Sequence, residues 1–150
     1  MASVRTAIPF WILSLLLLLF ISMAAREFTV GGNKCSWAVP ISPAGSLQKW
    51  PHSRRFFVGD FLIFEYDPKV HSVLRVTKED YESCNGRNPI QKYDDGRPKI
   101  ELNQKGIFYF IGGAEGFCEN GQKLAVVASS QSFRRLGAWS WFGKIITEIP

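Results

Sequence analysis

The stretch that decides the fold lies between residues 55 and 76 and reads RFFVGDFLIFEYDPKVHSVLRV. Three short runs rich in Val, Ile, Phe and Tyr are separated here by turn residues, Gly59-Asp60 after the first run and Asp67-Pro68 after the second. β-Branched and aromatic residues favour strands, whereas Gly, Asp and Pro favour the turns between them. The stretch therefore predicts three strands, over Arg55–Val58, Phe61–Tyr66 and Ser72–Val76.

The same alternation continues on both sides of this stretch, from Phe28 to Val127. It predicts four further strands, over Glu27–Val30, Lys99–Leu102, Gly106–Ile111 and Leu124–Val127. Short strands separated by turn signals at this density are typical of an all-β sandwich of two sheets with Greek-key connections. One segment breaks the pattern, because Thr77 stands three residues before Asp80 as in a capping box, which predicts a short helical segment near residues 77–83.

The N-terminal part predicts export. Residues 7–25 read AIPFWILSLLLLLFISMAA and follow a single charge, Arg5. A basic start, a leucine-rich centre and small residues at the end are the parts of a secretory signal peptide. We predict cleavage near Ala24 or Ala25, which leaves a domain over residues 26–127. An uncleaved membrane anchor is the alternative, and we disfavour it because the apolar run is on the short side and ends in small residues.

Composition narrows the class of protein further. A chain of 150 residues with 46% hydrophobic residues suits one domain with a packed core, and it excludes disorder throughout. The formal charge of +5 falls to +4 on cleavage, since residues 1–25 contain only Arg5 as a charged residue. This excess is too mild to indicate nucleic-acid binding.

Three cysteines, Cys35, Cys84 and Cys118, lie in the part expected to be exported, where an oxidising compartment permits disulfides. Their number implies one bridge and one unpaired thiol. The number alone does not say which pair closes.

Several segments carry a resemblance to a known family. The turn Tyr66-Asp67 followed by His71 at the start of a strand resembles the plant phytocyanins, which are plastocyanin-like cupredoxins. The resemblance covers about residues 27–127 and continues in four further segments: 28–32 (FTVGG) with Trp37 and Pro40, 81–84 (YESC) with Pro89, 106–111 (GIFYFI) and 116–124 (GFCENGQKL). It implies a cupredoxin-like Greek-key sandwich with a disulfide between Cys84 and Cys118. Cys35 departs from the family pattern, which leaves a free thiol, an intermolecular bridge and an inert buried side chain all open.

The resemblance also implies where copper would be held. In copper-binding phytocyanins the ligands are a histidine, a cysteine, a second histidine and an axial Gln or Met. His71 matches the first position and Gln122 the last, but Gly112 stands at the cysteine position and Phe117 at the second histidine position. Because the thiolate gives a blue-copper site its electronic character, we expect no metal site and no copper cofactor.

This departure resembles the early nodulin-like branch of the phytocyanins. The resemblance implies a non-catalytic binding or signalling module, secreted to the apoplast or held at the outer face of the plasma membrane, with a cell-wall glycan, a proteoglycan or a receptor ectodomain as its partner. The alternative function is a small copper electron-transfer protein. An enzyme is not expected, because no nucleophile lies in an activating motif and no glycine-rich phosphate loop occurs.

Residues 128–150 form a basic and aromatic tail without strand alternation, in which Gly137 and Gly143 weaken any helix. We predict that this tail is disordered, with membrane contact as the alternative, and it does not make a convincing GPI signal. Elsewhere His52 is expected at the surface beside Arg54 and Arg55. These arginines suit contact with an acidic glycan or protection of a strand edge by charge, and we favour the second.

Overall fold

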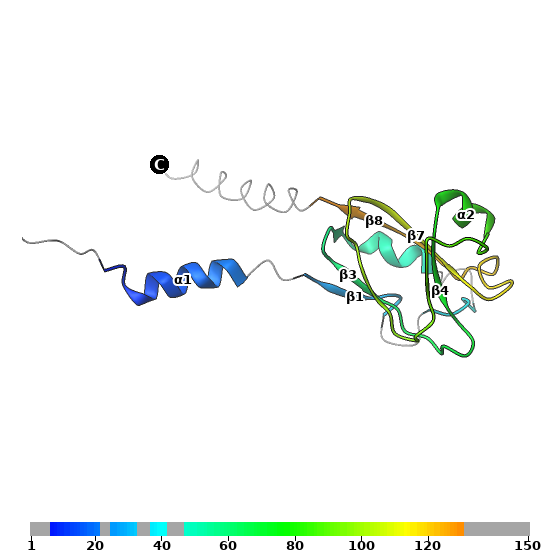
Figure 1. Cartoon of the computed structure of the whole chain (residues 1–150), viewed down its shortest axis with the longest axis horizontal. Helices are drawn as coiled ribbons and strands as arrows, with labels where there is room; N and C mark the ends of the chain where they lie inside the picture. The colour runs from blue at the N-terminus through cyan, green and yellow to red at the C-terminus, as the bar shows by residue number, and fades with distance from the viewer. Residues whose placement is uncertain (1–6, 22–24, 33–36, 42–46, 131–150) are drawn as a thin grey trace, which may run out of the picture.

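The strands of the protein form two sheets in the computed structural model, which describes residues 7–21, 25–32, 37–41 and 47–130 (Figure 1). One sheet has the strand order β1-β3-β6 and the other the order β2-β8-β7-β4-β5. The bounds are β1 Glu27–Thr29, β2 Phe56–Phe57, β3 Phe61–Ile63, β4 Val73–Val76, β5 Gln91–Tyr93, β6 Lys99–Glu101, β7 Gly106–Gly112 and β8 Lys123–Ser129. The all-β sandwich predicted from the sequence is confirmed.

The two sheets enclose the main core. Strand alternation points Leu62 and Ile100 of the small sheet toward Phe108, Phe110 and Val126 of the large one, and all five are buried. Aromatic rings link the layers, since Phe64 lies 5.2 Å from Phe110 and 5.0 Å from Trp37, between ring centroids. Burial of this apolar surface is the principal force that holds the sheets together.

Two pairings join distant parts of the chain in parallel. β1 runs alongside β3, and β2 runs alongside β8 with Phe56 opposite Ala128 and Phe57 opposite Ser129. The last strand, expected over Leu124–Val127, therefore extends to Ser129, because β2 offers it a further partner.

Some elements differ from the predicted ones. The strand expected over Phe61–Tyr66 ends at Ile63. Beyond it the amides of Phe64 and Tyr66 donate to the carbonyls of Pro98 and Gly96 outside regular ladder pairing. β5 and the 3₁₀ helix η2 (Leu47–Ser53) were not predicted, because β5 is polar and lies at a sheet edge while η2 contains Pro51.

The predicted helical turn is confirmed as α2 (Lys78–Ser83). The Thr77 side chain caps it by accepting a hydrogen bond from the Asp80 amide at 3.2 Å. The helix ends at Cys84, whose backbone is left-handed with φ 53°. α2 lies over the outer face of the large sheet, where a second cluster contains Leu74, Val76, Ile111 and Cys118.

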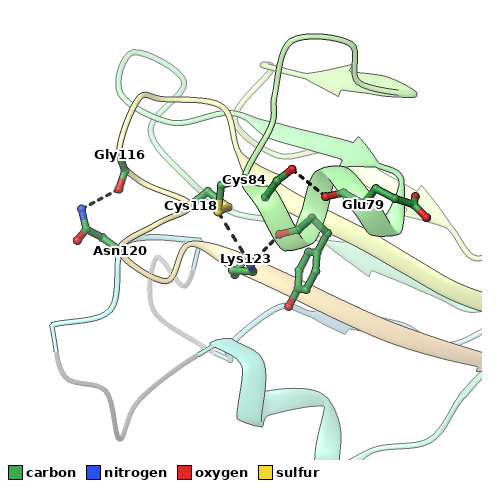
Figure 2. Close-up of a disulfide and its surroundings, with 8 residues drawn as sticks. Glu79, Cys84, Gly116, Cys118, Asn120 and Lys123 are labelled. Atoms are coloured by element: carbon green, nitrogen blue, oxygen red, sulfur yellow. Dashed lines mark hydrogen bonds between the residues drawn. A yellow bond between two sulfur atoms is a disulfide. The ribbon is translucent and has the colours of Figure 1, made fainter.

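The Cys84–Cys118 disulfide, which the resemblance implies, is confirmed. It fastens the end of α2 to the loop between β7 and β8, and Figure 2 shows Lys123 beside it. The Lys123 ammonium donates to the Tyr81 carbonyl at 2.7 Å and lies 4.2 Å from the centre of the Tyr81 ring. Burial raises the pKa of the Tyr81 hydroxyl, with a smaller contribution from Tyr109, so this ring stays neutral.

At the N-terminus the apolar segment contains the helix α1 (Phe10–Ile21). No helix among the described residues combines the length and apolarity needed to cross a bilayer. Cleavage near Ala24 or Ala25 stays a prediction. Cys35 and tail residues 131–150 lie outside the described residues.

Reduction of the disulfide is expected to lower the free energy of unfolding by about 3 to 4 kcal/mol, because the bridge closes a loop of 34 residues and so restricts the unfolded chain. Denaturant titrations with and without reductant measure this difference. The same loss is expected for the Cys84→Ala/Cys118→Ala variant, whose unfolding should then be insensitive to reductant. An unchanged midpoint would contradict the structural role assigned to the bridge.

Candidate functional site

The four positions carried over from the copper family lie together at one end of the large sheet. Gly112 is the last residue of β7, Gln122 immediately precedes β8, and Phe117 lies in the loop between these strands. The Gly112 amide donates to the Gln122 carbonyl at 2.8 Å, and the Gln122 amide donates to the Phe117 carbonyl at 2.9 Å. His71 enters from the loop before β4, where its amide donates to the Asp67 carbonyl at 2.9 Å. The Asp67 turn thus positions His71 at this end of the sheet.

The centre of the site is the fully buried side chain of Gln122. Its amide nitrogen Nε2 donates to the Trp37 carbonyl at 3.1 Å and lies 2.9 Å from His71 Nδ1. Because the amide NH₂ offers only donors, His71 Nδ1 is the acceptor of this bond. Trp37 is held from its other end as well, since its indole N–H donates to the Ser72 carbonyl at 2.9 Å.

The absence of a side chain at Gly112 gives the Gln122 amide its space. A Cβ atom on Gly112 would lie 2.0 Å from Gln122 Oε1 and 2.7 Å from Gln122 Cδ, both far inside contact distance. The glutamine therefore fills the volume that a cysteine side chain would need. Its Oε1 atom is buried and has no hydrogen-bond partner among the described residues.

Phe117 is the second position at which this chain lacks the ligand expected in a copper-binding relative. Its ring lies 5.3 Å from the His71 ring, between centroids, and presents an apolar surface where the family has an imidazole. Gly112 and Phe117 supply no donor atom, and His71 Nδ1 is engaged by Gln122. The described residues contain no group of three or more His, Cys, Asp or Glu side chains that could hold a metal ion. The residues present do not fit a blue-copper centre.

Beside Gly112 lies a shallow hollow of about 310 Å³, bounded by the disulfide and the loop over residues 112–119. Its lining carries both signs of charge, with Arg87 on one side and Glu115 and Glu119 on the other. Figure 2 shows the side chain of Asn120 reaching back across this loop, and its Nδ2 donates to the Gly116 carbonyl at 2.7 Å. This bond closes the loop around Phe117, because it joins Asn120 on one side of Phe117 to Gly116 on the other.

Two residues outside the ligand pattern also form hydrogen bonds in or beside the site. The roles of Trp37 and of Lys123 were not predicted, because one acts through a backbone carbonyl and the other through a bond to the Tyr81 carbonyl. His52, Arg54 and Arg55 are exposed as expected and belong to a different region, in and after η2. The guanidinium of Arg54 lies 4.8 Å from the Trp50 ring centre.

Comparison with known proteins is consistent with this picture. Residues 37–122 match the family model described as "Plastocyanin-like domain". Early nodulin-like protein 12 of Arabidopsis thaliana is 44% identical over 137 residues, which cover 88% of this chain and 71% of that protein. Early nodulin-like protein 14 of the same plant is 50% identical over 115 residues, covering 77% of this chain and 63% of that protein. The chain thus spans between about three-fifths and seven-tenths of these relatives.

Solved structures of blue copper proteins share the fold. The cucumber basic protein, described as a blue copper protein, superposes with a TM-score of 0.60 at 35% identity, over 69% of this chain and 100% of that one. Cucumber stellacyanin, described with Cu²⁺, superposes with a TM-score of 0.62 at 27% identity, over 71% of this chain and 98% of that one. The expected cupredoxin-like fold is confirmed.

The close packing of Gly112 against Gln122 predicts a coupled pair. Gly112→Ala is expected to lower the free energy of unfolding by about 1–3 kcal/mol, because the added methyl group overlaps the buried amide. In a Gln122→Ala background the same change should cost much less, since the overlapping atoms are gone. Denaturant titration of both single variants and the double variant measures the coupling. An equal cost in both backgrounds would show that the amide does not fill this space.

Proposed function

Because this chain belongs to the early nodulin-like proteins of the plastocyanin-like family, we propose that it is a non-catalytic binding or signalling module of the cell exterior that does not use copper. The observation that carries the proposal is the Gln122 side chain, which occupies the volume beside Gly112 where a thiolate would lie. Without the thiolate the scaffold lacks the group that couples blue copper to an electron-transfer partner. Its remaining use is recognition through its surface.

The place of action in this proposal is the apoplast or the outer face of the plasma membrane. The apolar segment that contains α1 supports it, as does the Cys84–Cys118 bridge, because such bridges persist in oxidising compartments. The partner is a macromolecule of that compartment, a cell-wall glycan, a proteoglycan or a receptor ectodomain. Catalysis is not part of the proposal, because the site pairs His71 with an amide and an aromatic ring rather than with a nucleophile.

Copper electron transfer is the second candidate, favoured by one observation. His71 and Gln122 keep two ligand positions of the family and lie in contact. Both cysteines among the described residues are joined in the disulfide, so neither supplies a thiolate to this end of the sheet. The second candidate would require a sulfur ligand from elsewhere in the chain.

Copper titration separates the two functions. We expect the full chain to show no intense blue absorption band after addition of Cu²⁺, and to retain no stoichiometric copper after desalting. The variant Gly112→Cys/Phe117→His restores the missing sulfur and imidazole, and it is expected to develop the band once the Gln122 side chain has shifted to make room for the cysteine. A matched control, Gly112→Ser/Phe117→His, restores the imidazole but no sulfur and should remain colourless. An intense blue band in the unaltered chain would overturn the proposed function.

A further inference from the structure

The outer face of the large sheet carries an apolar strip that α2 does not cover. Alternation along β7 and β8 turns Phe108 and Val126 into the core and points Ile107 and Val127 outward, directly opposite each other. Ile107 is 52% exposed and Val127 57% exposed. One step along the strands, Tyr109 lies opposite Ala125, and both are half-buried. Contiguous exposed apolar surface, when bordered by polar residues, is a feature of docking sites.

This strip forms the floor of a groove. Two adjoining hollows of about 430 and 440 Å³ share Arg54, Phe56 and Val127 in their linings. One side of the groove is formed by the end of η2, which packs beside β8, and by the two arginines that follow it. We call this feature the η2 groove and define it by Arg54, Arg55, Ile107, Tyr109, Ala125 and Val127.

The wall of the η2 groove is positively charged. Arg54 is held in place, because one guanidinium nitrogen donates to the Trp50 carbonyl and to the Ser53 hydroxyl, each at 3.1 Å. The remaining N–H groups of that guanidinium keep their capacity to donate to a carboxylate. The described lining contains no acidic residue, and neither Arg54 nor Arg55 forms an ion pair within the described part of the chain.

A carboxylate does lie near this region, but it is used elsewhere. Asp60 is buried, pairs with Arg26 at 3.0 Å and accepts a bond from the Phe57 amide at 2.9 Å. It therefore compensates Arg26. No ion pair within the described residues involves Arg54 or Arg55, which suits a ligand with carboxylates.

We infer that the η2 groove docks an extended segment of a partner protein in which carboxylate side chains flank aliphatic or aromatic ones. We favour a peptide over a sugar, because the floor combines Ile107, Ala125 and Val127, which suit aliphatic side chains, with only the half-buried ring of Tyr109 as an aromatic surface in the definition of the groove. Guanidinium groups along one wall pair with carboxylates in a forked geometry. The inference rests on the proposed binding function and names its surface and the chemistry of the partner.

Peptide selection tests this groove directly. A library of random twelve-residue peptides displayed on phage is panned on the immobilised full chain, after depletion on the Arg54→Gln/Arg55→Gln variant. We expect enrichment of peptides that contain Asp or Glu beside Leu, Ile, Val or Phe. One enriched peptide, synthesised with a fluorescent label, then reports affinity by anisotropy.

The variants have defined expectations. Arg54→Gln/Arg55→Gln should weaken binding of the labelled peptide by about tenfold or more and flatten its dependence on salt. Ile107→Thr/Val127→Ser should also weaken binding, and both positions are exposed enough that the fold tolerates the change. The matched control is Lys69→Gln/Ile90→Thr, which removes one exposed cation and one exposed aliphatic side chain away from the groove and should bind like the unaltered chain.

Four results would overturn the inference. They are the absence of enriched peptides, binding that the arginine variant leaves unchanged, arginine-dependent binding of oligogalacturonate without any peptide, and binding confined to a synthetic peptide of residues 131–150 of this chain. The third result would assign the groove to an acidic glycan, and the fourth would assign it to the protein's own tail. Copper titration of the same sample keeps the two proposals separate, because a blue band overturns the proposed function while failed panning of a copper-free chain overturns only the groove.

Discussion

The buried amide of Gln122 is the interaction on which the functional end of the molecule depends. It joins three segments that are remote in sequence: Trp37 before η2, the His71 loop before β4, and the start of β8. In a copper protein of this fold the metal performs this cross-linking through its ligands. In this protein two hydrogen bonds and close packing around Gln122 join the same segments, and this packing requires that Gly112 have no side chain. The glycine at the cysteine position and the placement of the Gln122 amide are therefore coupled features.

The two faces of the large sheet differ in burial: the inner face packs in the core, whereas part of the outer face is exposed. The inner face forms the core against β3 and β6, and part of the outer face is covered by α2, which Cys84–Cys118 fastens. Elsewhere on the outer face Ile107 and Val127 are exposed, beside the arginines of the η2 groove. A ligand on this strip would touch only the outward side chains of β7 and β8 and would leave the bridge and the core in place.

Much of this architecture could be predicted from the sequence, because local chemistry determines it. Alternation of apolar residues located most strands, Thr77 marked the start of α2, and the family resemblance identified the disulfide and the four positions that meet around Gln122. β5 escaped prediction because a short polar edge strand is specified by its pairing with β4 rather than by its own residues. The hydrogen bond from Gln122 to the Trp37 carbonyl was not predicted either, because every residue has a backbone carbonyl and the residue type therefore does not identify this acceptor. The η2 groove depends on the register of β7 against β8, which places Ile107 opposite Val127. Only the folded structure reveals this register.

The position of β8 in the large sheet has a consequence for the way the chain folds. β8 is the last strand among the described residues, yet it lies between β2 and β7 in the sheet, so Phe56 pairs with Ala128, a residue far along the chain. Contacts between residues so far apart in sequence form late and slowly, because the chain loses the entropy of closing a long loop before the strand pairing stabilises it. During synthesis the first hundred residues therefore have no complete large sheet to form. The complete large sheet can therefore form only after β8 has been synthesised, and until then β2 lacks its partner strand.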